Sequence, residues 1–157
     1  MAVNISGLKD NARKTAVAEL NARLADAIAL ALAIKQAHWN VKGPNFIAVH
    51  ELFDQVRTRF DDHVDTMAER VQQLDGTAVG TAEEVAKGST LKPYPTNLTK
   101  SADHIREICA RMRDHGANIR AAIDATDEAG DADTADIFTA ISRDLDKDLW
   151  FLESHLE

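Results

Sequence analysis

Residues that break helices are few in this chain, and all the prolines and most of the glycines fall in three places. The sequence of 157 residues holds 3 prolines and 7 glycines. Gly43-Pro44 interrupts it early, the stretch 76–95 carries the other two prolines, and 126–133 is rich in Asp and Gly. The residues between these points are mostly of types that favour helix over strand. The sequence therefore predicts an all-α fold, and residues 1–157 form one domain of ordinary size.

Apolar residues recur every three or four positions between the breaks, which predicts long amphipathic helices. A short helix is expected after Thr81, where the sequence resembles a capping box. The expected helices span 14–40, 45–74, 82–87, 97–125 and 134–155, after a short N-terminal tail over 1–13. Two short connections with one long connection between them are typical of a four-helix bundle with a single crossover, the ferritin-like arrangement.

Charge and composition exclude several classes of protein. The formal net charge of −8 makes nucleic acid an unfavourable partner and favours cations. Charged residues interrupt every apolar run, so we expect neither a membrane span nor a signal peptide. The single cysteine, Cys109, suits a reducing cytoplasm and lies in an apolar helical pattern, where a buried structural thiol is expected.

One face of the expected helix 45–74 carries residues that can bind metal. With about 100° per residue, and His50 set at zero, Asp54 lies near ~40°, Asp65 near ~60° and Glu69 near ~100°. This face is separate from the apolar stripe of the same helix. Residues four apart can share a ligand, but the two pairs are separated by roughly 16 Å of helix. No single metal ion spans that distance.

A second copy of the helix, running antiparallel across a two-fold axis, would solve this problem. His50 and Asp54 of one chain would then face Asp65 and Glu69 of the other. His38 ends the preceding helix just before a tight turn, so it should join His50 and Asp54. This donor set suits Fe(II), and also Mn or Zn. The sequence thus predicts a metal site between subunits.

Other interpretations of these residues remain. A solvated polar face is one of them, because Asp61 lies at a similar angle with no obvious metal role. A di-iron site inside one bundle is another, but it requires Glu-x-x-His pairs, and the chain has none. His63 is expected to pack or to support a ligand. The remaining histidines are expected at the surface: His104, His115 and His155.

The stretch from Lys35 to Gly76, KQAHWNVKGPNFIAVHELFDQVRTRFDDHVDTMAERVQQLDG, closely resembles the Dps family (DNA-binding protein from starved cells). The resemblance continues through LKPYPTNL and DTADIFTAISRDLDKDLWFLE. It implies a cage of twelve subunits built from two-fold dimers. It also implies ferroxidase centres at the dimer interfaces, formed by His38, His50, Asp54, Asp65 and Glu69.

The resemblance further implies that the chain oxidises Fe(II), preferentially with hydrogen peroxide, and stores ferric mineral, which protects DNA from oxidative damage. Acidic pores at a three-fold axis would admit iron, and by position their residues are Asp127, Asp131 and Asp136. Ordinary helix capping also explains aspartate at these positions. Trp39, beside His38, is either interface packing or an electron donor that traps radicals.

DNA-binding members of the family often carry a mobile Lys-rich tail. The N-terminal tail of this sequence is short, so DNA binding is not expected on this ground. The alternative is a protein that binds DNA and condenses the nucleoid, with iron oxidation secondary. A purely structural helical oligomer with vestigial ligands is the third hypothesis.

Overall fold

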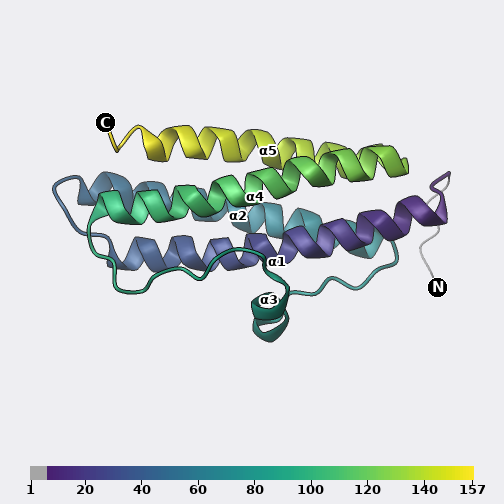
Figure 1. The fold of residues 1–157 in the computed structure, drawn as a ribbon, viewed down its shortest axis with the longest axis horizontal. Helices are drawn as coiled ribbons and strands as arrows, with labels where there is room; N and C mark the ends of the chain where they lie inside the picture. The colour runs from purple at the N-terminus through teal and green to yellow at the C-terminus, as the bar shows by residue number, and fades with distance from the viewer. Residues whose placement is uncertain (1–6) are drawn as a thin grey trace.

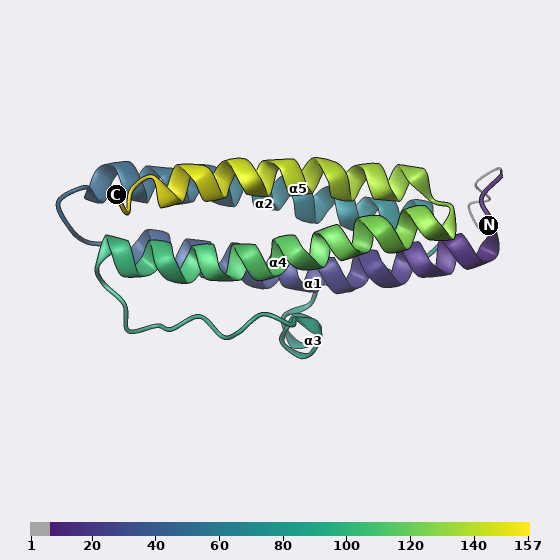
Figure 2. The same cartoon turned by 45° about the horizontal axis from the view of Figure 1, so that its top comes forward.

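The computed structural model describes residues 7–157 and contains five helices in that range. They are α1 (Asp10–Asn40), α2 (Phe46–Gln73), α3 (Ala82–Gly88), α4 (Ser101–Ala129) and α5 (Ala132–Glu153). The four long helices form one bundle, in which α1 lies against α2 and α4, and α5 lies against α4 and α2 (Figures 1 and 2). The short α3 packs on the outside of α1. The predicted all-α, ferritin-like arrangement is confirmed.

The start of α4 differs from the sequence prediction for a reason that depends on distant contacts. α4 begins at Ser101 rather than near 97, because the residues before it pair with the turn that connects α1 to α2. The amide of Lys42 donates to the carbonyl of Thr99 at 2.7 Å, and the amide of Ser101 donates to the carbonyl of Lys42 at 3.0 Å. These bonds hold residues 99–100 extended.

The predicted turn over 126–133 was too long. α4 continues to Ala129, and the chain reverses within Gly130 and Asp131. Gly130 has a φ of 98°, in the left-handed region where glycine carries no steric penalty. The first expected helix also starts earlier than predicted, at Asp10, so residues 10–13 of the predicted tail are helical. Residues 1–6 of that tail lie outside the described residues.

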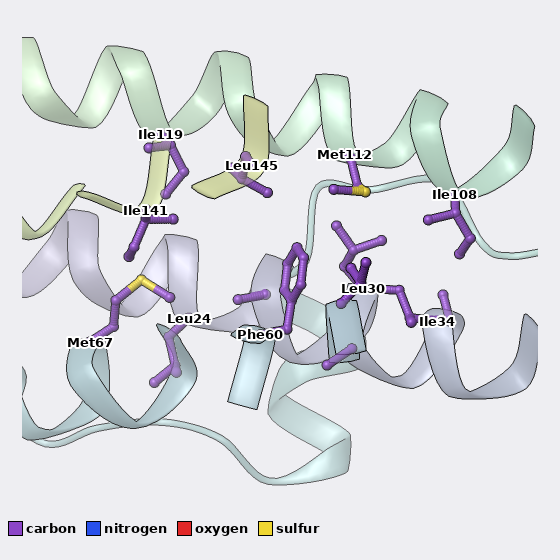
Figure 3. Close-up of a cluster of buried hydrophobic side chains, with 14 of the residues drawn as sticks. Leu24, Leu30, Ile34, Phe60, Met67, Ile108, Met112, Ile119, Ile141 and Leu145 are labelled. Carbon is purple, nitrogen blue, oxygen red and sulfur yellow. The ribbon is translucent and has the colours of Figure 1, made fainter. Parts of the chain in front are cut away.

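The apolar stripes of the four long helices meet along the axis of the bundle. Figure 3 shows Leu24, Leu30, Phe60 and Met112 pointing into this interior from α1, α2 and α4. Phe60 and Met112 are fully buried, as is most of the α2 stripe that the sequence predicted. Cys109 lies in the same core, and burial raises the pKa of its thiol to about 12, so the predicted structural thiol is confirmed. Over residues 7–157, no helix is long and apolar enough to cross a membrane.

Two histidines that we expected at the surface are buried instead. His104 is 1% exposed and His115 is 0% exposed. Both lie on faces of α4 that turn inward, and sequence spacing alone did not identify them as core residues. The third, His155, is half-buried at the end of the chain, where its Nδ1 lies 3.0 Å from the carbonyl oxygen of Phe151.

His115 should make the protein less stable in acid. Burial lowers its pKa to about 4, and Arg23 and His63 add to this effect while Asp26 opposes it. An unfolded chain binds the proton near pH 6.5, so stability is fully present above that pH and is lost as the pH falls toward 4. The loss should reach about 3 kcal/mol at full protonation. Denaturant unfolding between pH 7 and 4 should show a weaker pH dependence in His115→Leu.

The half-buried His155 provides the matched control for this prediction. His155→Gln should keep the pH dependence of the original chain. Equal pH dependence in His115→Leu and the unaltered protein would show that His115 does not cause the acid sensitivity.

Candidate metal centre

The turn between α1 and α2 brings the predicted imidazole ligands together. Gly43 has a φ of 139°, a backbone conformation that residues with a side chain rarely adopt. The amide of Phe46 donates to the carbonyl of Gly43 at 3.1 Å, and α2 starts at Phe46. The rings of His38 and His50 stack with their centroids 3.7 Å apart and their planes 21° from parallel. The sequence expectation that His38 lies beside His50 is therefore confirmed.

A reciprocal pair of hydrogen bonds fixes both rings. Nδ1 of His38 lies 2.8 Å from the carbonyl oxygen of His50, and Nδ1 of His50 lies 2.8 Å from the carbonyl oxygen of His38. A carbonyl can only accept, so each Nδ1 must carry the hydrogen. Each Nε2 then keeps its lone pair, which is the form of histidine that binds a metal.

Asp54 lies one turn beyond His50 on α2 and completes this cluster. Its Oδ1 is 3.8 Å from Nδ1 of His38 and forms a hydrogen-bonded ion pair with Nζ of Lys35. The Lys35 ammonium lowers the pKa of Asp54 below its usual value. Asp54 is therefore a carboxylate at neutral pH. We call His38, His50 and Asp54 the imidazole half-site.

Lys35 should compete with a metal ion for this carboxylate. An exposed ion pair of this kind contributes little, so Lys35→Gln should raise the affinity for Zn(II) about two- to fivefold. Isothermal titration calorimetry of the metal-free protein measures the change. Lys42→Gln is the control, because the exposed Lys42 makes no ion pair in the described residues. A lower affinity in Lys35→Gln would instead mean that Lys35 positions Asp54 for binding.

Asp65 and Glu69 lie on the same helix, farther along, and we call them the carboxylate half-site. Both side chains are exposed and make no ion pair within the described residues. Asp61 differs from them, because it accepts a hydrogen bond from Nε of Arg57 at 2.8 Å. Its position on this face therefore has an explanation within the subunit.

One subunit does not assemble a complete metal site. Within residues 7–157, no three His, Cys, Asp or Glu side chains are grouped so that they could hold a metal ion. Between α2 and α5, His63 Nε2 lies 3.0 Å from Oδ2 of the half-exposed Asp144, and Arg59 pairs with the buried Asp148. Both carboxylates therefore have partners within the subunit. The two half-sites remain separate. The carboxylate half-site is exposed on α2, whereas the imidazole half-site joins the buried His38 of α1 to His50 and the exposed Asp54 of α2.

Large apolar side chains are exposed near the imidazole half-site. Leu32 is 58% exposed, Trp39 is 67% exposed and Ile47 is 59% exposed. Leu32 and Trp39 are seven residues apart and so lie on one face of α1. Exposed apolar groups of this size are typical of surfaces that contact another protein chain.

The three aspartates considered for a pore differ in their surroundings. Asp127 and Asp136 are exposed. Asp131 is 2% exposed, caps α5 by accepting from the amide of Thr134 at 3.1 Å, and accepts a hydrogen bond from Arg70 at 2.9 Å. Of the two roles that the sequence allowed for these aspartates, pore lining and helix capping, Asp131 has the capping role, and its carboxylate is paired with Arg70 of its own subunit.

Comparison with known proteins places the chain in a family. The ferritin-like domain family matches residues 17–157. The DNA protection during starvation protein of Agrobacterium fabrum is 56% identical over 150 residues, which cover 96% of this chain and 93% of that protein. The chain therefore belongs to the ferritin-like proteins and, within them, to the Dps family.

Solved structures agree with this assignment. A Dps protein from Bacillus brevis superposes with a TM-score of 0.89 at 31% identity, covering 96% of this chain and all (100%) of that one. Dps from Microbacterium arborescens, solved in a high iron form, superposes with a TM-score of 0.88 at 34% identity, covering 94% of this chain and 96% of that one.

Proposed function

We propose that this protein oxidises Fe(II) at sites shared between two subunits and stores the ferric product inside a cage of twelve. The observation that carries the proposal is the fixed pair of imidazoles. Neither Nε2 is used by the hydrogen bonds that fix the rings, and the Asp54 carboxylate lies 3.8 Å from Nδ1 of His38, while two further carboxylates on the same helix make no ion pair within residues 7–157. The donor set suits Fe(II) as substrate, and Zn or Mn can occupy the same ligands.

Hydrogen peroxide is the preferred oxidant in this proposal. One peroxide takes up two electrons, and two Fe(II) ions held at one site supply one electron each. Two protons complete the reaction, which gives two Fe(III) and two water molecules. Because both electrons reach the peroxide together, no hydroxyl radical is released. The carboxylates of Asp54, Asp65 and Glu69 offset the charge of the iron. Protection of DNA then follows from removing the reagents that damage it.

A two-fold axis supplies the missing ligands. An antiparallel pair of α2 helices would place the imidazole half-site of one chain opposite the carboxylate half-site of the other. The exposed Leu32, Trp39 and Ile47 offer apolar area for such a contact. Trp39 would then lie beside the site, where its indole could donate an electron and trap a radical. Family membership supports the cage of twelve.

Iron entry is proposed at an acidic pore around the three-fold axis. Asp127 and Asp136 flank the α4–α5 turn with exposed carboxylates. A ring of such groups raises the local concentration of cations by focusing the electric field. Asp131 is left out of this proposal because it is buried against Arg70.

Direct DNA binding is the alternative function. The relatives' name, DNA protection during starvation protein, fits either mode of protection. A formal charge of −8 on each chain opposes contact with phosphate, so we expect no gel shift at physiological salt. A shift that weakens steeply as salt rises would support the alternative.

Anomalous diffraction tests the proposed function. Crystals soaked anaerobically with Fe(II) should show iron between the imidazole half-site of one subunit and the carboxylate half-site of another. A parallel soak with Zn(II) shows whether the same ligands accept a redox-inert ion. Iron found only inside the four-helix bundle, near His63, would contradict the proposal.

A further inference from the structure

A tyrosine–histidine pair lies outside the proposed iron site. Tyr94 is the only tyrosine in the chain and belongs to the segment that leads from α3 to α4. Its hydroxyl oxygen is 2.5 Å from Nδ1 of His104, a short distance for a neutral hydrogen bond. The two rings are nearly parallel, at 16°, with centroids 6.2 Å apart. Tyr94 packs against the edge of the hydrophobic core, and His104 is buried beside it.

Arg111 holds Tyr94 in this position. Its Nε donates to the carbonyl of Lys92 at 2.9 Å, and a second nitrogen donates to the carbonyl of Pro93. The guanidinium carbon stands 5.2 Å from the centre of the Tyr94 ring. Glu107 in turn accepts a hydrogen bond from Arg111 at 2.6 Å. The phenol is thus clamped against α4.

The surroundings of His104 set the direction of the hydrogen bond. The ring is 1% exposed, and within residues 7–157 its Nε2 makes no hydrogen bond. Burial lowers the pKa of His104, while the backbone of Asn40 and Leu98 beside the ring opposes this effect. The Tyr94 hydroxyl makes no other hydrogen bond within residues 7–157, so Nδ1 of the neutral imidazole is the acceptor for its O–H. Tyr94 therefore donates to His104, and burial raises the pKa of Tyr94 so that it stays protonated.

We propose that Tyr94 and His104 form a redox-active pair, in which loss of an electron from the phenol is coupled to transfer of its proton to the imidazole. The O–H bond of Tyr94 breaks and an N–H bond forms at Nδ1 of His104. One electron leaves the phenol and reduces a one-electron oxidant. The products are a neutral tyrosyl radical and an imidazolium. A further Fe(II) can return the electron, become Fe(III), and so restore the phenol.

The pair lies next to the end of α1 that carries His38. His104 packs against the backbone of Asn40, two residues after His38 and one after Trp39. The segment between α3 and α4 runs along α1 to the end of the bundle where α1 gives way to α2 (Figure 1). The pair is therefore at the end of the bundle that holds the imidazole half-site, where an oxidising equivalent that escapes the iron site can reach it. The suggestion that the oxidant comes from the iron site rests on the proposed function, whereas the redox chemistry of the pair does not.

The first experiment therefore uses metal-free protein and a photochemical oxidant, a ruthenium polypyridyl complex with persulfate. Because Tyr94 is the only tyrosine, any tyrosyl signal in electron paramagnetic resonance comes from it. The expected result is a neutral tyrosyl radical whose high-field spectrum shows a strong hydrogen bond from an exchangeable proton. A radical without that coupling, or no tyrosyl radical at all, would overturn the proposal. This measurement needs no substitution and so does not depend on a variant's folding.

A variant then tests the proton acceptor. In His104→Gln the yield of tyrosyl radical should fall about tenfold, the factor that one hydrogen bond of ordinary strength provides. His155→Gln should leave the yield unchanged, because His155 follows α5 and its Nδ1 lies against the carbonyl oxygen of Phe151 rather than against Tyr94. If a folded His104→Gln variant gave an undiminished yield of tyrosyl radical, the hydrogen bond between Tyr94 and His104 would have only a structural role.

Repeating the measurement with Fe(II) and hydrogen peroxide separates this inference from the proposed function. If iron is oxidised but neither oxidant produces a tyrosyl radical, the inference about the pair fails and the proposed function stands. If light produces the radical but the protein does not accelerate iron oxidation, the proposed function fails and the pair stands. Both are supported if both oxidants give the radical and His104→Gln weakens it.

Discussion

Replacing His50 and Asp54 together with alanine should reduce peroxide-driven Fe(II) oxidation at least about a hundredfold, because even supporting groups around a metal are worth about 10- to 100-fold. The substitution removes one imidazole whose Nε2 is held ready for metal and the carboxylate beside it. The stacked His38 alone cannot bind two iron ions. The initial rate of ferric absorbance after anaerobic addition of hydrogen peroxide measures the loss.

Asp61→Ala is the matched control for this prediction. Asp61 lies on the same helix and is equally exposed, but it is paired with Arg57 and belongs to neither half-site. Its replacement should leave the rate of iron oxidation unchanged. If the double variant of His50 and Asp54 oxidised iron as fast as Asp61→Ala, the ligands would be vestigial and the protein a structural oligomer.

Asp131→Ala should destabilise the protein by about 3–5 kcal/mol, the usual cost of leaving one partner of a buried ion pair alone. The substitution removes the buried carboxylate that pairs with the Arg70 guanidinium, which is 7% exposed and donates to Asp131 at 2.9 Å, and leaves it hydrogen-bonded only to the neutral acceptors Thr134 and Gln73. It also removes the cap of α5, where Asp131 accepts from the amide and the hydroxyl of Thr134. Denaturant unfolding at fixed protein concentration measures the change, since assembly contributes to stability.

Asp136→Asn separates this structural role from iron entry. Asp136 is exposed, so its substitution should change the free energy of unfolding by less than about 0.5 kcal/mol. If Asp136 lines the entry pore, the variant should take up iron more slowly while remaining fully folded. An Asp131→Ala variant as stable as the original chain would show that Arg70 finds another partner.

The ligand face could be predicted from sequence because helical periodicity is a local property. His50, Asp54, Asp65 and Glu69 lie on one helix, and the angle between any two follows from their spacing. The turn between α1 and α2 could be predicted equally well, since Gly43-Pro44 permits few alternatives. Both features depend on residues close together in the chain.

Features that depend on distant residues were missed. The bonds between Lys42 and the 99–101 segment delay the start of α4, and the sequence gives no local sign of them. The burial of His104 and His115 depends on which helices face α4. Lys35 of α1 pairs with Asp54 of α2, nineteen positions away, and the pattern of either helix alone does not predict this ion pair. Asp131 had a capping signal, but its buried partner Arg70 lies sixty-one positions away.

The claim that the iron site crosses between subunits is tested most directly by mixing two inactive variants. One variant carries His50→Ala with Asp54→Ala, and the other carries Asp65→Ala with Glu69→Ala. In a dimer of one chain of each, one site loses both half-sites and the other keeps both intact. Random pairing makes half of all dimers mixed, so co-expression should restore about one quarter of the original sites. Each variant expressed alone should oxidise iron no faster than the background reaction. A co-expressed mixture that is also inactive, although both variants assemble, would show that no site is shared between subunits.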